Sequence, residues 1–171
     1  MDFVYYVLAG LKAYIEQETT ITPGQVIAGD DGFAALQPKI ILIGEKLLDD
    51  PEDLNPHVKI FHDPEKGTEK LDEYDEIGET MGFGHHFVVT CRCMFTRDKF
   101  VRDEAIQVAM DLFNRVKKGI LNHLDASFEG DEEAFLMQRA LRKFVYKEAG
   151  GPPNEWIWDA TFEISIVTQR P

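Results

Sequence analysis

The hydrophobic residues of this chain recur with two different periods, and each period predicts one kind of secondary structure. Spacings of three and four residues predict helices over 2–18, 99–124 and 131–148. Strict alternation of apolar and polar residues predicts long strands over 85–96 and 155–168. The second of these strands alternates for more than twice the usual five or six residues, which suggests an edge that extends past its own sheet to pair with a partner.

Shorter apolar runs predict two further strands. Lys39 to Ile43 lies between Pro38 and Gly44, and its consecutive aliphatic residues indicate a strand that is buried on both faces. Val58 to Phe61 is a second short run. Together the patterns predict one α+β domain over 1–171, with a mainly antiparallel sheet of about four strands packed against two or three helices.

Acidic residues concentrate in one part of the chain. Residues 45–84 hold 13 acids and 4 lysines, a net charge of −9, whereas the whole chain carries −13. A segment of 40 residues with little predicted structure is unusual inside a compact domain. We therefore expect residues 45–84 to form an extended acidic arm that contacts a neighbouring subunit.

The composition also limits the classes of function. A charge of −13 argues against broad affinity for nucleic acid, because binding to phosphates needs a basic surface. No apolar run approaches the length of a membrane-spanning helix, and the first ten residues lack the basic region of a secretory signal. We expect a reduced protein that is made in the cytosol.

Candidate chemistry is sparse. Cys91 and Cys93 lie on the apolar face of a predicted strand and lack metal-ligand spacing, so we interpret them as buried thiols. The acids from Asp72 to Glu76 lack the order of a calcium loop. No nucleophile elbow, phosphate-binding loop or helical zinc motif is present. We expect no enzymatic activity, no cofactor and no metal.

Three segments resemble the tail-terminator (tail-completion) proteins of long-tailed bacteriophages and related small neck proteins of the head–tail junction. They are the opening helix Phe3 to Leu11, the strand His86 to Phe95 followed by the helix Arg102 to Leu124, and the closing strand Trp156 to Ile164. The resemblance rests on the order of elements. It implies a structural virion protein, assembled in the host cytoplasm, that forms a hexameric ring on the tail tube.

The same resemblance implies the partners: further copies of the chain, the tail-tube protein and the neck proteins on the head side. DNA would at most pass through the lumen. Acids that line such a ring would repel DNA phosphates and let the duplex slide. From the residues themselves, we expect the subunit interface to draw on the apolar side chains of the acidic arm, the basic cluster late in 131–148 and the paired tryptophans: Phe61, Tyr74, Ile77, Met81, Phe83, Arg139, Arg142, Lys143, Trp156 and Trp158.

Three alternatives stay open from the sequence. The chain could be another connector of the head–tail junction, such as a stopper or adaptor. It could be a small-molecule binding domain or enzyme, if a deep pocket gathered acids with two or more of the histidines His57, His62, His85 and His86. It could also be an inhibitor that mimics nucleic acid, although its acids concentrate in one arm rather than in regular surface rows.

Overall fold

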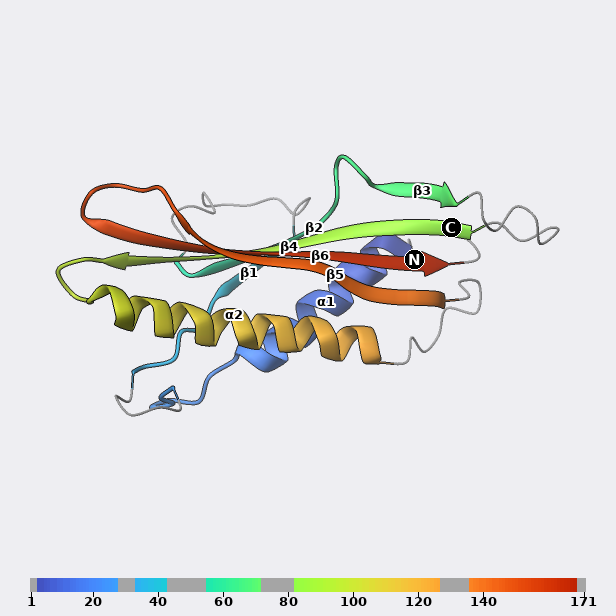
Figure 1. Ribbon diagram of the computed structural model, residues 1–171. Coiled ribbons are helices and arrows are strands. Elements are labelled where there is room, and N and C mark those ends of the chain that lie inside the picture. The colour runs from blue at the N-terminus through green and yellow to red at the C-terminus, as the bar shows by residue number, and fades with distance from the viewer. Residues whose placement is uncertain (1–2, 28–32, 43–54, 72–81, 127–135, 169–171) are drawn as a thin grey trace.

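Two helices lie on one face of a six-stranded sheet in the residues that the computed structural model describes, which are 3–27, 33–42, 55–71, 82–126 and 136–168 (Figure 1). The helices are α1 (Phe3–Thr19) and α2 (Arg102–Asp125). The strands are β1 (Lys39–Leu42), β2 (His57–His62), β3 (Thr68–Leu71), β4 (Gly82–Thr96), β5 (Leu136–Ala149) and β6 (Glu155–Thr168).

The sheet is mixed. Its strand order is β1-β2-β4-β6-β5; β1 and β2 are parallel, and the other pairs are antiparallel. Strand β3 continues the path of β2 along the same edge of β4 after a five-residue excursion over 63–67. His86 anchors both ends of that excursion, since its carbonyl accepts from the Asp63 amide (2.8 Å) and its amide donates to the Gly67 carbonyl (2.9 Å). Gly67 turns the chain with a φ of +51°.

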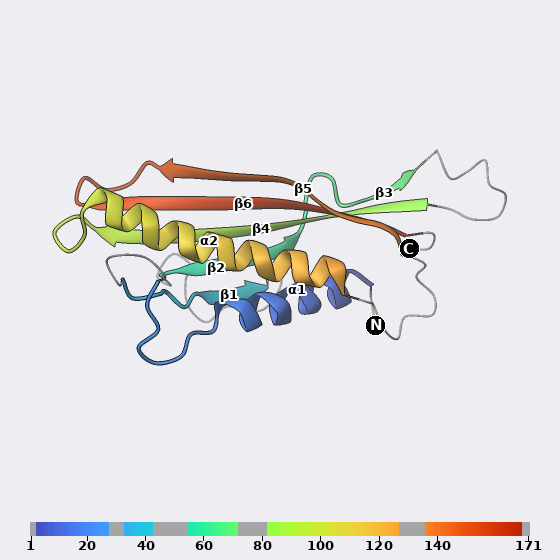
Figure 2. The ribbon, with the colours of Figure 1, turned by 60° about the horizontal axis from the view of Figure 1, so that its bottom comes forward.

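Both helices cover the same face of the sheet, so its other face has no described helix over it (Figure 2). Helix α1 packs on β1 and β2, and α2 packs on β4, β5 and β6. Alternation within β4 and β6 directs one side of each strand into this layer. The core contains the buried side chains Val7, Leu11, Ile15, Val58, Ile60, Phe87, Val89, Cys91, Cys93, Leu112, Phe113, Val116, Ile120, Phe162, Ile164 and Ile166.

The two helices approach closely because glycine stands at two contact points. A Cβ atom at Gly119 of α2 would lie 2.8 Å from the Ile15 Cα atom and 2.9 Å from the Tyr14 carbonyl oxygen. A Cβ atom at Gly10 of α1 would lie 2.6 Å from His123 Nε2. Any larger side chain at Gly119 would therefore meet the backbone of α1 and separate the helices.

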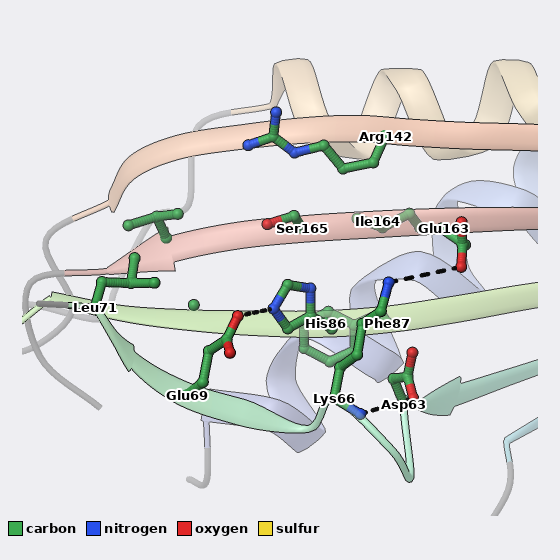
Figure 3. Close-up of a pocket in the computed structure, with 12 residues that line it drawn as sticks. Asp63, Lys66, Glu69, Leu71, His86, Phe87, Arg142, Glu163, Ile164 and Ser165 are labelled. Atoms are coloured by element: carbon green, nitrogen blue, oxygen red, sulfur yellow. Dashed lines mark hydrogen bonds and ion pairs between the residues drawn. The ribbon is translucent and has the colours of Figure 1, made fainter. Parts of the chain in front are cut away.

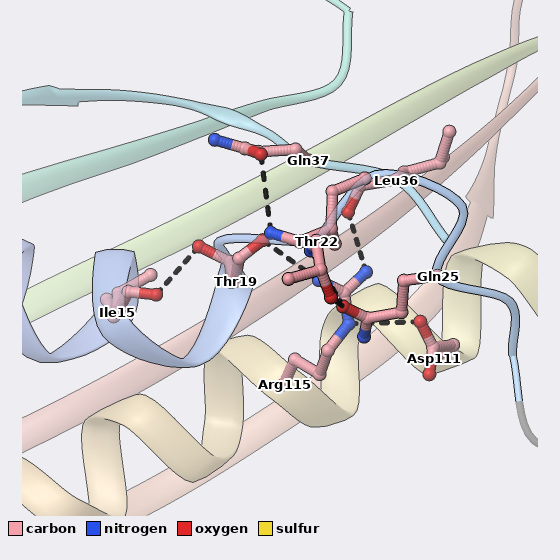
Figure 4. A network of polar contacts seen from close by, with 9 residues as sticks. Ile15, Thr19, Thr22, Gln25, Leu36, Gln37, Asp111 and Arg115 are labelled. Carbon is pink, nitrogen blue, oxygen red and sulfur yellow. Dashed lines mark hydrogen bonds and ion pairs between the residues drawn. The ribbon is translucent and has the colours of Figure 1, made fainter. Parts of the chain in front are cut away.

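A polar network joins the end of α1 to α2 and to the loop before β1 (Figure 4). The Arg115 guanidinium donates to the Thr19 carbonyl (3.1 Å), the Leu36 carbonyl (2.6 Å) and the Asp111 carboxylate (3.0 Å). Helix C-termini leave carbonyls without helical partners, and a cation stabilises them. Arg115 thereby connects three segments that are distant in sequence.

Most elements agree with the periodicity of the sequence. Helices α1 and α2 and strands β1, β4 and β6 begin and end within a few residues of their predicted bounds. All three apolar residues of β1 are buried, including Ile41 on the face that no described helix covers. The α+β class also agrees with the structure.

The prediction of a mainly antiparallel sheet of about four strands is wrong, whereas the two described helices fall within the predicted two or three. The sheet has six strands with one parallel pair, and the described residues form two helices. The main error is the helix predicted over 131–148, where the structure has strand β5. Residues 136–149 are rich in good helix formers such as Leu, Arg, Lys and Ala, but pairing along the whole of β6 outweighs that preference.

Because the segment that forms β5 is predicted as a helix, the sequence wrongly predicts β6 as the edge of the sheet. Strand β6 was expected to be an overlong edge, yet it lies between β4 and β5 and is antiparallel to both. The expected acidic arm, 45–84, contains β2, β3 and the start of β4. Its residues 45–54 and 72–81 lie outside the described part of the chain.

Candidate interaction site

Strand β5 forms one outer edge of the sheet and is 14 residues long. Among the described strands it pairs only with β6. Two of its apolar side chains are unusually open to solvent: Phe144 is 45% exposed and Val145 41% exposed. A long edge with apolar side chains is a template for contact with another chain.

Basic residues accompany these apolar side chains on β5. Lys143 stands opposite Glu163, and Lys147 stands opposite Asp159, both across the β5–β6 pair. The register shifts between Leu141 and Lys143, so Arg142 lies at a bulge. On the helix-covered side, Lys117 of α2 places its Nζ atom 4.0 Å from the centre of the Phe144 ring.

A row of charged and polar side chains crosses the face of the sheet that no described helix covers. The strand register places Lys39 of β1 next to His57 of β2, and His57 opposite Arg92 of β4. Arg92 is in turn opposite Asp159 of β6, which is opposite Lys147 of β5. We call these five residues the cross-strand row. Arg92 and Asp159 form a two-pronged ion pair, with Nε–Oδ1 and Nη2–Oδ2 distances of 2.8 and 2.9 Å.

A pocket of about 320 Å³ opens over the cross-strand row. Its lining includes Lys59, Arg92 and Lys147 but only one carboxylate, Asp159, and it has a net charge of +2 with His57 neutral. Thr90 and Thr161 supply hydroxyl groups between these charges. The pocket is therefore basic, on a chain whose total charge is −13.

A second pocket, of about 400 Å³, lies on the same face toward the other end of β4 (Figure 3). The excursion after β2 and strand β3 form one wall, and Arg142 of β5 stands on the opposite side. His86 contacts Glu69 at 2.9 Å, and Lys66 lies 3.9 Å from Glu163. Both signs of charge are present and largely paired, so this pocket shows no preference for an anion or a cation.

The turn at the mouth of this second pocket is held by Asp63. Its carboxylate accepts hydrogen bonds from the backbone amides of Glu65 and Lys66, at 2.9 and 3.1 Å. The bond from Lys66 is the largest influence that lowers the pKa of Asp63 below its ordinary value. Asp63 is therefore a structural carboxylate of the turn.

The expected interface residues separate into several groups. Arg142 and Lys143 lie exposed on β5, whereas the Arg139 guanidinium donates to the carbonyl of Ala126 just after α2. Phe61 and Phe83 are half-buried strand residues. Tyr74, Ile77 and Met81 lie outside the described residues.

The two tryptophans contribute mainly to packing within the subunit. Trp158 is buried, and Trp156 is half-buried against the core. Arg97 covers the Trp156 ring at 5.2 Å and Arg102 covers the Trp158 ring at 5.6 Å, measured to the ring centres. They form no exposed aromatic platform.

Of the four histidines that the enzyme alternative requires, His62 and His85 share contacts with the Thr68 hydroxyl, whereas His57 and His86 lie apart. His57 and His86 line different pockets. His85 is buried between the hydroxyls of Thr68 and Thr168, at 2.9 and 3.0 Å. His62 contacts the Thr68 hydroxyl from the other side, at 3.2 Å.

The cysteines are buried and reduced. Burial raises the pKa of Cys91 well above its ordinary value, and the neighbouring Cys93 adds to this effect, so the thiol stays protonated. Within the described residues, no group of three histidine, cysteine or acidic side chains is placed to hold a metal ion.

The cross-strand row was not predicted from the sequence. Alternation does place Arg92 and Asp159 on the polar faces of their strands, and this was the available signal. Their pairing depends on the register of β4 and β6, which alternation does not define. Lys147 was missed because its segment was predicted as a helix.

No family model matches this chain, and no curated protein matches it in sequence. Neither α1 nor α2 has a stretch that is apolar and long enough to cross a lipid bilayer. The geometry of the described residues is therefore the basis for a functional proposal.

Proposed function

We propose that this chain is a structural protein that assembles with copies of itself into a ring, as the tail terminator of a long-tailed phage. The observation that carries the proposal is strand β5, an outer edge of 14 residues with exposed Phe144 and Val145. Edge strands of soluble proteins are usually short, twisted away or covered. A long apolar edge is therefore best explained by a partner that covers it.

The charges on β5 favour a head-to-tail contact. If two β5 edges paired with each other, Arg142, Lys143 and Lys147 of both copies would come close together, and like charges across strands are destabilising. The β5 edge should instead meet a different surface of the next copy. Contacts of this heterologous type close into rings when the rotation between copies allows it.

The order of elements and the acidic composition support the assignment within phage tails. The opening helix, the long strand followed by the second helix, and the closing strand keep the order that suggested tail terminators, with strand β5 added before the closing strand. The proposed ring is a hexamer on the tail tube, with head-side neck proteins on its other surface. Its negative charge would keep DNA from adhering as it passes.

Sedimentation velocity of the purified protein, alone and mixed with tail tubes, tests the proposal. We expect a hexamer under at least one of these conditions. Val145→Lys should reduce assembly strongly, because it places a charge in the apolar edge. Leu121→Lys is the matched control, since Leu121 is 39% exposed on α2. A monomer under both conditions, or equal assembly of both variants, would contradict the proposal.

A further inference from the structure

One pocket on the face that no described helix covers has a charge opposite to that of the chain. The pocket over the cross-strand row carries +2, with His57 neutral, whereas the whole chain carries −13. Lys59 and Lys147 enter this pocket from β2 and β5 and form no ion pair with a described residue. Two lysines with no ion-pair partner among the described residues, beside an arginine, are suited to a ligand with several carboxylates.

The chain itself contains such a ligand. Residues 72–79 carry five acids (Asp72, Glu73, Asp75, Glu76 and Glu79) and no basic residue. Complementary charge favours an acidic occupant of the basic pocket, and 72–79 carries −5 against −4 for the other acidic segment, 45–53. A nucleic acid would be repelled by the rest of a chain at −13.

The segment is poorly placed to reach the cross-strand row of its own subunit. Its ends are attached to Leu71 and Gly82, which stand opposite each other on β3 and β4. Since these ten residues must leave and return to adjacent strands, they can reach back along the sheet by only half their extended length, about 18 Å. Arg92 lies ten residues along β4 from Gly82, a distance of roughly 33 Å. Stretched side chains would cover only part of the remaining gap of roughly 15 Å to Arg92, whereas a neighbouring copy has no such restriction.

We propose that the pocket over the cross-strand row binds the acidic segment 72–79 of a neighbouring copy of this chain. This inference rests on the proposed ring, and it identifies the surface that receives one subunit from the next. Lys59, Arg92 and Lys147 contact the carboxylates, and Asp159 keeps the Arg92 guanidinium in place through the two-pronged ion pair. The β5 edge, which contributes Lys147, borders the same surface.

Binding of a labelled peptide to the full-length protein tests the surface without requiring a ring. The probe is a fluorescent peptide of residues 71–81, and the control peptide has its five acids replaced by the corresponding amides. At low salt we expect the acidic peptide to bind more tightly than the amide control peptide. Its affinity should fall as the salt concentration rises. Absence of binding at millimolar peptide, or equal binding of both peptides, would overturn the inference.

Two matched variants locate the peptide on the protein. Lys59→Gln combined with Lys147→Gln should weaken binding at least tenfold, and Lys99→Gln combined with Lys118→Gln should leave it unchanged. A peptide of residues 45–53, which carries five acids and one lysine, provides a competing acidic sequence. Tighter binding of that peptide, or equal binding by both double variants, would overturn the assignment to 72–79 and this pocket.

Assembly measurements on the same variants separate the two proposals. If the wild-type protein forms rings and Lys59→Gln with Lys147→Gln forms them equally well, this inference fails and the proposed function stands. If the acidic peptide binds at the pocket but the wild-type protein remains monomeric alone and on tail tubes, the proposed function fails. Loss of both peptide binding and ring formation in the double variant, with its unfolding midpoint unchanged, would support both.

Discussion

Arg92 and Asp159 stand directly opposite each other on β4 and β6, and their side chains form two parallel contacts of 2.8 and 2.9 Å. Asp159 is the more buried partner, with 15% of its side chain exposed against 37% for Arg92. The pair joins the two longest adjacent strands on the face that no described helix covers. It also orients the arginine within the basic pocket.

The ion pair should stabilise the subunit measurably. In a double-mutant cycle with Arg92→Met and Asp159→Asn, we expect a coupling free energy of about 1 kcal/mol, because the contact is two-pronged and partly shielded from water. The exposed pair of Arg102 and Glu148 is the control and should give less than about 0.5 kcal/mol. Urea unfolding measures both cycles, and equal coupling in the two would refute this prediction.

The close contact of α1 and α2 depends on Gly119. Glycine normally weakens a helix, so Gly119→Ala would stabilise an isolated α2. In the folded chain the added methyl group would lie 2.8 Å from the Ile15 Cα atom, and we expect a net loss of about 1–3 kcal/mol. Asn114→Ala, an exposed change in the same helix, should be nearly neutral. Thermal unfolding that ranks the two variants in the opposite order would argue against tight helix packing at this point.

Arg115 should matter more for stability than other basic residues of α2. Arg115→Ala leaves the Thr19 and Leu36 carbonyls and the Asp111 carboxylate without their shared donor, and we expect a loss of about 2–3 kcal/mol. Lys118→Ala removes an exposed ion pair to Glu18 and should cost less than about 0.5 kcal/mol. If chemical denaturation shows similar losses for both variants, the network does not hold these segments together.

His123 should make stability depend on pH. Burial, assisted by the nearby Arg139 charge, lowers the pKa of His123 to about 4 from an ordinary 6.5. The unfolded chain therefore takes up a proton between these values that the folded chain does not. The free energy of unfolding should fall by about 3 kcal/mol from this group as the pH drops from 6.5 to 4, with no contribution above 6.5.

Comparison with His123→Gln isolates the contribution of this histidine. The variant cannot take up the proton, so its stability should decline less steeply between pH 6.5 and 4 than that of the wild-type protein. Because the glutamine side chain can pack differently, the stability at neutral pH can also change. The comparison therefore uses only the slope of the free energy of unfolding against pH. The same slope in both proteins would show that His123 is not protonated on unfolding.

Local patterns in the sequence predict those elements whose burial follows a single period. Helix α2 and strands β4 and β6 each bury an apolar stripe along most of their length, so their periods identify them. Strand β5 carries apolar residues at spacings that also suit a helix, and the bulge near Arg142 interrupts its alternation. Its identity comes from pairing with β6, a contact between distant parts of the chain.

The candidate site depends even more on such long-range contacts. The cross-strand row takes one residue from each of five strands, and its formation requires the register of every neighbouring pair. A shift of one residue in any strand would turn its member of the row toward the helices. The sequence shows the polar faces of individual strands, and the folded sheet determines which charges meet.

The mass and shape of the assembled protein test the central claim most directly. Electron microscopy of the purified chain, alone and on tail tubes, should show hexameric rings in which β5 of one copy contacts the next copy. Isolated monomers in both samples, or rings in which the β5 edge faces solvent, would contradict the account.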